Sequence, residues 1–208
     1  MSKPKEHIDP RVVRTRQLLR DALIALIHER GFESLTVKDI TERATLNKAT
    51  FYLHYKDIDD LLIQSTVELQ EELVTAIGLP MITEATLTSS LLALLVLVFE
   101  HFALYKDFYD VVLNKIGTPP VIVAIQNPIE TMSQRTIARL HSPDAVVDQD
   151  LIIRFMSSAC IGLMQRWLAT SADRSPKYMA EQCLNLLAYG IYNSLRHSQT
   201  EKENQPNE

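Results

Sequence analysis

Seven side chains near residue 50 have the chemistry needed to contact a nucleic acid. They are Lys48, Ala49, Thr50, Tyr52, His54, Tyr55 and Lys56. A lysine can reach guanine edges in the major groove, and a threonine methyl group can meet a thymine methyl group. Tyrosine, histidine and lysine can bind phosphate oxygens on either side. This pattern favours DNA binding over the alternative, a solvated helix face with aromatic edges.

The elements that must position these side chains are helices. Apolar residues at helical spacing predict a first helix over 11–30. Thr36 and Asp39 have the spacing of a capping box at the start of a short second helix. Asn47 is placed to cap a third helix, which ends near His54. Two short helices packed on a longer one predict a helix-turn-helix.

The rest of the chain is also predicted to be helical, because it contains no alternating strand pattern bounded by hairpin turns. Asp57 and Asp60 mark the start of a fourth helix. Further helices are predicted over 86–104, 106–116, 120–140, 147–171 and 176–196. The expected fold class is therefore all-α, with about nine helices: an N-terminal three-helix helix-turn-helix domain and a C-terminal helical bundle.

Charge is unevenly distributed along the 208 residues, whose net charge is −5. Residues 1–56 carry 11 basic and 7 acidic side chains, and residues 57–208 carry 10 and 19. A basic head on an acidic body indicates that only the head approaches a polyanion, although chance clustering of surface charge would look the same.

Several other classes of protein are disfavoured. The longest apolar run is 91–99, whereas a helix needs about 20 apolar residues to cross a bilayer. The polar N-terminus does not resemble a secretory signal. Cys160 and Cys183 are too few for a disulfide framework or a four-thiolate metal site, and their apolar surroundings indicate reduced core residues. No phosphate-binding glycine loop, nucleophile elbow or zinc motif is present. We expect a soluble cytoplasmic protein that is not an enzyme and binds no membrane, metal or cofactor.

The order and spacing of these features resemble the TetR family of transcriptional regulators. The resemblance covers about residues 14–62, including the run 31–40, the run 47–57 and the pair Leu61-Leu62. Residues 155–168 and 175–180 are more loosely similar to the branch that includes dihydroxyacetone-kinase-type regulators.

The resemblance implies an all-helical homodimer with a defined domain order. We expect a flexible N-terminal arm over 1–10 and a helix-turn-helix DNA-binding domain over 11–56. A C-terminal ligand-binding and dimerisation domain follows over 57–197, and 198–208 form a disordered tail.

The resemblance also assigns roles to residues of the head. Thr36 contacts the DNA backbone, the first turn of the third helix reads bases, and Phe51 is a core anchor. The expected DNA-binding set is Thr36, Lys38, Asn47, Lys48, Ala49, Thr50, Tyr52, His54, Tyr55 and Lys56.

Three positions depart from the family pattern. Thr45 replaces the usual glycine of the turn, so the turn forms without its easiest residue. Ala49 replaces a glycine that is frequent early in the third helix. Ile58 replaces a lysine that would contact phosphate, and the neighbouring Asp59 and Asp60 weaken phosphate attraction there.

Two further sets of residues are candidates in the C-terminal region. A pocket between helices is expected from His101, Tyr105, Gln126, Met132, Gln165, Arg166 and Trp167. A dimer interface, with an ordinary intrachain core as the alternative, is expected from Phe155, Ala159, Gly162, Leu163, Cys183, Leu187, Gly190 and Ile191.

The expected function is that of a TetR-like repressor, which an effector releases from a palindromic operator in double-stranded DNA. Its other partners are a second copy of the chain and an effector, either a small molecule or a protein. Two alternatives stay open: a helical ligand- or protein-binding adaptor with weakened DNA binding, and an activator with a protein partner.

Overall fold

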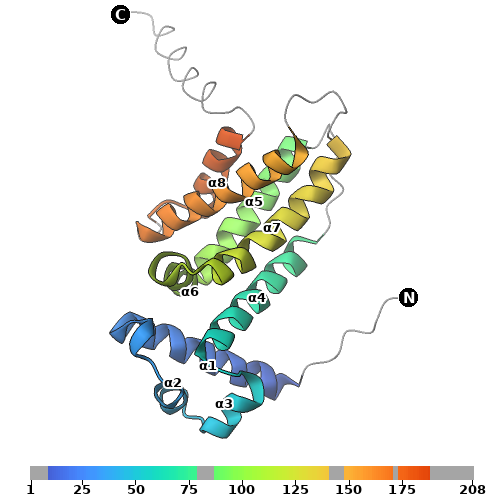
Figure 1. Cartoon of the computed structure of the whole chain (residues 1–208). Helices are drawn as coiled ribbons and strands as arrows, with labels where there is room; N and C mark the ends of the chain where they lie inside the picture. Colours follow the sequence, from blue (N-terminus) through green and yellow to red (C-terminus); the bar gives the residue numbers. More distant parts are fainter. Residues whose placement is uncertain (1–8, 79–86, 141–147, 171–172, 188–208) are drawn as a thin grey trace, which may run out of the picture. The chain divides into compact units, whose positions relative to one another are not determined.

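The computed structural model describes residues 9–78, 87–140, 148–170 and 173–187, and every regular element in these ranges is a helix. The predicted all-α fold class is confirmed (Figure 1). The chain forms two compact units. The first consists of Met1–Gln70 and Val111–Ile125, and the second of Glu71–Asp110 and Gln126–Glu208.

The helix-turn-helix lies in the first unit. It consists of α1 (Pro10–Arg30), a short 3-10 turn η1 (Phe32–Ser34), α2 (Val37–Arg43) and α3 (Lys48–His54). The next helix, α4 (Ile58–Ile77), begins in this unit. Apolar side chains from all four helices form the core, which includes Leu19, Leu23, Leu26, Ile40, Phe51, Leu61 and Leu62. The predicted ends of the first three helices are confirmed to within a residue or two.

Ion pairs and hydrogen bonds also connect elements of the first unit. Arg16 Nη1 on α1 lies 2.5 Å from Glu68 Oε1 on α4. Lys115 Nζ lies 2.7 Å from His28 Nδ1 at the end of α1. Lys115 thus adds a contact to α1 from a segment far away in the sequence.

The second unit is built from longer helices. These are α5 (Leu87–Leu104), α6 (Lys106–Asp110), most of α7 (Pro119–Leu140), α8 (Gln149–Ala169) and a helix over 176–187. Phe99 of α5 packs edge-to-face on Trp167 of α8, with ring centroids 5.4 Å apart. Ser157 of α8 donates a 3.2 Å hydrogen bond to Glu130 of α7. Figure 1 shows these three helices running alongside one another.

One predicted helix has a different form. Residues 106–116 are divided into α6 and a π-helical segment η3 (Val111–Ile116). The Gly117 N–H donates to the Val112 carbonyl at 3.0 Å, five residues back, as in a π-helix. Val111, Val112 and Leu113 are all buried. Three consecutive buried residues do not follow the 3.6-residue period on which the prediction relied.

No helix of the described ranges is by itself long and apolar enough to cross a membrane. By length and composition, Thr88–Leu104 and Lys106–Ile116 pass that test only as a pair, which is bent by 88°.

Candidate nucleic-acid interface

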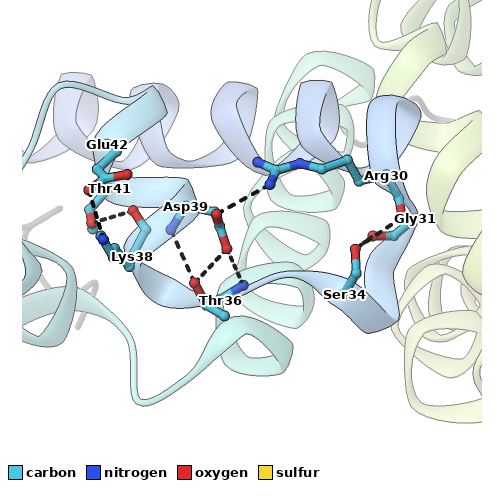
Figure 2. Close-up of polar contacts among 8 residues, drawn as sticks. All are labelled: Arg30, Gly31, Ser34, Thr36, Lys38, Asp39, Thr41 and Glu42. Atoms are coloured by element: carbon cyan, nitrogen blue, oxygen red, sulfur yellow. Dashed lines mark hydrogen bonds and ion pairs between the residues drawn. The ribbon is translucent and has the colours of Figure 1, made fainter.

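A capping box fixes the start of α2, as the sequence predicts. The Thr36 N–H donates to Asp39 Oδ2 at 2.9 Å, and the Asp39 N–H donates to Thr36 Oγ1 at 3.2 Å. Arg30 Nη1, at the end of α1, lies 3.3 Å from Asp39 Oδ1 (Figure 2). The hydrogen bonds from the Thr36 side chain and backbone, with the nearby Arg30 charge, lower the pKa of Asp39. The N-terminus of α2 is therefore held by its capping box and contacts the end of α1 through an exposed ion pair.

The turn between α2 and α3 is made by a residue in a left-handed conformation. Thr45 has a φ of +57°, the only positive φ among the described non-glycine residues. Its N–H donates to the Glu42 carbonyl at 3.2 Å, and the Leu46 N–H donates to the Thr41 carbonyl at 2.8 Å. A β-branched residue is strained at such a φ, so this turn stores conformational energy that glycine would not.

Asn47 caps α3 as predicted. Its Oδ1 accepts hydrogen bonds from the Thr50 N–H at 2.7 Å and from the Thr50 hydroxyl at 3.0 Å. Both side chains are therefore engaged in forming the start of the helix. Lys48 and Ala49, in the first turn, are exposed.

The outer surface of α3 carries two rows of exposed side chains. Lys48 and Tyr52 are four residues apart in one row, and Ala49 and Leu53 are four apart in the other, while the exposed Lys56 follows the end of the helix. Tyr52 is 59% exposed and Leu53 is 81% exposed. We call Lys48, Ala49, Tyr52 and Leu53 the α3 face. Leu53 was not among the expected DNA contacts, although its spacing from Ala49 places it on the same side of the helix.

Phe51, on the inner side of α3, and Tyr55, the residue directly after this helix, are both buried. Phe51 is completely buried, which confirms its predicted role as a core anchor. Tyr55 is only 2% exposed, and its hydroxyl has no hydrogen-bond partner among the described residues. Burial and the nearby Glu68 carboxylate raise the pKa of Tyr55 to about 12. This burial contradicts the expectation that the Tyr55 hydroxyl lies on the DNA-facing surface.

Neighbouring residues affect the charge of two other expected DNA contacts, His54 and Lys38. Burial and the positive charge of Arg16 lower the pKa of the half-buried His54, so its imidazole is neutral at pH 7 and offers hydrogen bonding without charge. Lys38 is exposed, and its Nζ lies 3.6 Å from Glu42 Oε1 (Figure 2). Such an exposed pair contributes little stability, so the ammonium group is available to a phosphate.

Two of the acidic residues next to the α3 face, Asp57 and Asp60, form hydrogen bonds at the start of α4. The Asp60 N–H donates to Asp57 Oδ1 at 2.8 Å, and the Lys56 N–H donates to Asp60 Oδ2 at 2.9 Å. Asp60 is therefore a capping residue, whereas Asp59 is exposed.

In the second unit, the structure brings together two of the residues expected to bind a ligand. The His101 and Tyr105 rings lie 4.9 Å apart. His101 Nε2 lies 2.9 Å from the Tyr109 hydroxyl, and the Tyr105 hydroxyl donates to Glu72 at 2.7 Å. Burial lowers the pKa of His101, against the opposing effect of the Glu72 charge.

The other expected ligand-binding residues differ in their surroundings. Trp167 is buried, and its indole N–H donates to the Arg174 carbonyl at 3.0 Å, which is a structural role. Arg166 is exposed, and Gln126 and Gln165 are half-buried. The side chain of Met132 lies outside the described residues.

The residues expected at a dimer interface differ in exposure. Phe155 is 64% exposed and Gly162 is exposed, whereas Ala159, Leu163 and Leu187 are half-buried. Cys183 is completely buried within the second unit, which contradicts its placement on an interface. Gly190 and Ile191 lie outside the described residues. Three further exposed apolar side chains occupy the same two helices: Leu151, Tyr178 and Leu186.

Comparison with known protein families gives two matches. Residues 19–64 match the model of bacterial regulatory proteins of the tetR family, and residues 89–189 match a TetR-type model described as a transcriptional regulator C-terminal region. Together these matches extend over more than half of the chain.

Individual proteins are similar over most of the chain. The uncharacterized HTH-type transcriptional regulator YxbF of Bacillus subtilis (strain 168) is 28% identical over 192 residues, which is 88% of this chain and 47% of that protein. The chain thus spans about half the length of this curated relative.

Two solved structures share the fold. FadR from Bacillus subtilis in complex with stearoyl-CoA has a TM-score of 0.68 and 17% identity, covering 84% of this chain and 98% of that one. The dihydroxyacetone kinase operon activator DhaS has a TM-score of 0.59 and 16% identity, covering 86% and 97%.

Proposed function

Because the chain belongs to the TetR family of transcriptional regulators, we propose that it binds double-stranded DNA through the α3 face and represses transcription from a palindromic operator. In this role it works in the cytoplasm, as a homodimer whose DNA affinity is controlled by an effector bound in the second unit. The family match shows membership of the TetR family. The operator, the homodimer and the effector concern the activity of the whole protein, and we propose them in addition.

The observation that carries this proposal is the division of α3 into two sides. Phe51 anchors the inner side in the core, so the outer side is presented as a rigid surface. That surface combines a lysine and a small residue in the first turn with an exposed tyrosine one turn later. Lys48 and Ala49 suit base edges in the major groove, and Tyr52 and Lys56 suit flanking phosphates.

The start of α2 supplies a second group of contacts. Thr36 and Lys38 are exposed there, and the backbone N–H groups of a helix N-terminus attract phosphate. The Thr36 hydroxyl belongs to the capping box, so this residue acts mainly by holding the helix start in place. Lys38 supplies the charge.

A DNA titration tests the proposal. The probe is the DNA that flanks the gene, cut into fragments that contain inverted repeats, with scrambled fragments as the reference. We expect preference for one fragment and a steep loss of affinity with rising salt. Lys48→Ala should weaken binding about tenfold and reduce the preference, while Lys177→Ala, an exposed lysine of the second unit, should leave both unchanged. Equal, weak binding to every fragment would instead identify the adaptor alternative.

Exposed apolar side chains support the homodimer. Leu151 and Phe155 on α8, with Tyr178 and Leu186 on the helix over 176–187, leave apolar surface on the helices expected to pair. Phe155→Asp should convert a dimer to monomers in analytical ultracentrifugation. Leu104→Asp, which also replaces a highly exposed apolar residue, should leave the dimer intact. A wild-type chain that sediments as a monomer at all concentrations would contradict this part of the proposal.

The polar group around His101 supports an effector site in the second unit. Ring packing and a hydrogen bond join the half-buried His101 and Tyr105 to the exposed Glu72, within a unit of largely apolar helices. The FadR relative binds stearoyl-CoA, so long-chain acyl-CoA is the first effector to test. We expect long-chain acyl-CoA to lower the affinity of the protein for the operator. His101→Gln should reduce this effect of acyl-CoA and leave DNA binding without acyl-CoA unchanged.

DhaS is an operon activator, so the likeness to it supports one alternative, activation of transcription instead of repression. A transcription assay with the operator upstream of a reporter distinguishes the two. Repression predicts more transcript when the gene is deleted, and activation predicts less.

A further inference from the structure

The two cysteines of the chain lie against each other in the second unit. Cys160 belongs to α8, and Cys183 belongs to the helix over 176–187. Their Sγ atoms are 3.6 Å apart. Cys160 is 6% exposed and Cys183 is completely buried. The DNA-binding surface, the exposed apolar residues and the His101 group make no use of this pair.

The geometry of the pair suits a covalent link. A disulfide requires the two sulfur atoms to approach to about 2.05 Å, which is about 1.5 Å closer than the contact seen here. The residues are 23 positions apart, on neighbouring helices, so a link between them closes a loop within one chain. Each thiol is also the nearest possible partner of the other, because the chain has two cysteines in all.

We propose that Cys160 and Cys183 are a redox modification site, where a hydroperoxide converts the two thiols into an intrachain disulfide that ties α8 to the helix over 176–187. This inference is independent of the proposed DNA binding.

The surroundings of the two sulfurs assign the order of the reaction. The hydrogen bond between them lowers the pKa of Cys160 and raises that of Cys183, and burial raises the latter further. Cys160 is 6% exposed and Cys183 is completely buried, so a peroxide reaches Cys160 first, and the Cys160 thiolate attacks it. A sulfur–oxygen bond forms, the O–O bond breaks and the distal oxygen leaves as an alcohol, or as water when the oxidant is hydrogen peroxide.

The second step closes the disulfide. The Cys183 sulfur attacks the Cys160 sulfenic acid, a sulfur–sulfur bond forms, the S–O bond breaks and the Cys183 proton leaves with the hydroxyl as water. With hydrogen peroxide, two thiols and one oxidant thus give one disulfide and two waters. Because Cys183 is already in contact, it reacts before a second peroxide can reach the buried sulfur. Burial also makes the first step slow, since the oxidant reaches Cys160 only when the helices open locally.

Mass spectrometry of the full-length chain tests the proposal. The reduced protein is treated with hydrogen peroxide, unreacted thiols are blocked under denaturing conditions, and the peptides are mapped without reduction. We expect the mass of the chain to fall by about 2 Da and both cysteines to escape the thiol-blocking reagent. A cross-linked pair of peptides should contain Cys160 and Cys183. The loop closure should raise the melting temperature by roughly 5–10 °C, and dithiothreitol should reverse the rise.

Matched variants serve as controls. Cys160→Ser and Cys183→Ser should each remove the cross-linked peptide and the rise in melting temperature under peroxide. Three results on the wild-type chain would overturn the proposal without any variant. In the first, both thiols stay free after a peroxide treatment that oxidises the unfolded chain. In the second, Cys160 becomes sulfinic acid while Cys183 stays a free thiol. In the third, disulfides form only between separate chains.

Discussion

The helix-turn-helix and the helices of the second unit place polar chemistry in opposite ways. In the first, the candidate functional groups are exposed on short helices whose ends are set by neighbouring residues such as Thr36 and Asn47. In the second unit, polar side chains of neighbouring helices contact one another, as His101 of α5 and Tyr109 of α6 do. A surface site depends mainly on local sequence, whereas an interior site depends on which distant residues are packed together.

The two sides of α3 give the sharpest test of this contrast. Phe51→Ala removes a completely buried ring and should cost about 3–5 kcal/mol, a large share of the stability of a domain. Leu53→Ala, at a position that is 81% exposed, should change stability by less than about 0.5 kcal/mol. Chemical unfolding followed by circular dichroism measures both.

The same experiment shows whether the two units respond separately. Trp167, the single tryptophan, is buried in the second unit, so its fluorescence follows that unit alone. Phe51→Ala should shift the circular dichroism transition and leave the fluorescence transition nearly in place. Equal shifts in both signals would show that the two units unfold as one cooperative block and do not differ in stability.

The turn between α2 and α3 should be improved by a single substitution. Thr45→Gly removes the strain of a β-branched residue at φ +57°, and it should raise stability by about 1 kcal/mol after the greater chain entropy of glycine is subtracted. Thr45→Ala retains a Cβ atom and should bring little gain. A loss of stability in the glycine variant, measured by urea unfolding, would contradict this assignment of strain.

Two tyrosines of α3 should respond differently to loss of the hydroxyl. Tyr55→Phe removes a buried hydroxyl that has no partner among the described residues, so stability should rise by up to about 1 kcal/mol and DNA affinity should stay the same. Tyr52→Phe should leave stability unchanged and weaken binding to all DNA fragments alike. If both variants weaken DNA binding equally, the inward placement of Tyr55 does not hold in the complex.

The smallest expected effect is a pH dependence in the second unit. The folded pKa of His101 lies below its ordinary value of 6.5, so the unfolded chain binds a proton first as pH falls. Stability should therefore decrease from about pH 7 downward and level off below the folded pKa. His101→Gln should flatten this slope in the Trp167 fluorescence signal, and His54→Gln in the first unit should not. An unchanged slope in His101→Gln would assign the effect to other groups.

Much of the helix-turn-helix could be predicted because its signals are local. The capping box of Thr36 and Asp39, the Asn47 cap and the Asp57 cap each depend on residues three positions apart, and each is confirmed. The burial of Tyr55 could not be read in the same way. It lies four residues after Phe51, and a polar aromatic side chain at that spacing fits either the core or the DNA surface.

The second unit was less predictable because its important contacts join residues far apart in the chain. Apolar spacing located its helices, but it assigned Cys183 to an interface and gave no sign that Cys160 lies beside it. It also grouped Trp167 with His101, whereas the indole bonds to Arg174.

The sequence by itself therefore determined the all-helical class, the ends of the short helices and the place of the helix-turn-helix. Helical periodicity and side-chain caps act over a few residues, and a linear pattern contains that information. Only the tertiary structure decided which side of each helix became core. It also formed the π-helical segment at 111–116 and paired the two cysteines. Those outcomes depend on how side chains from distant segments fill a common interior.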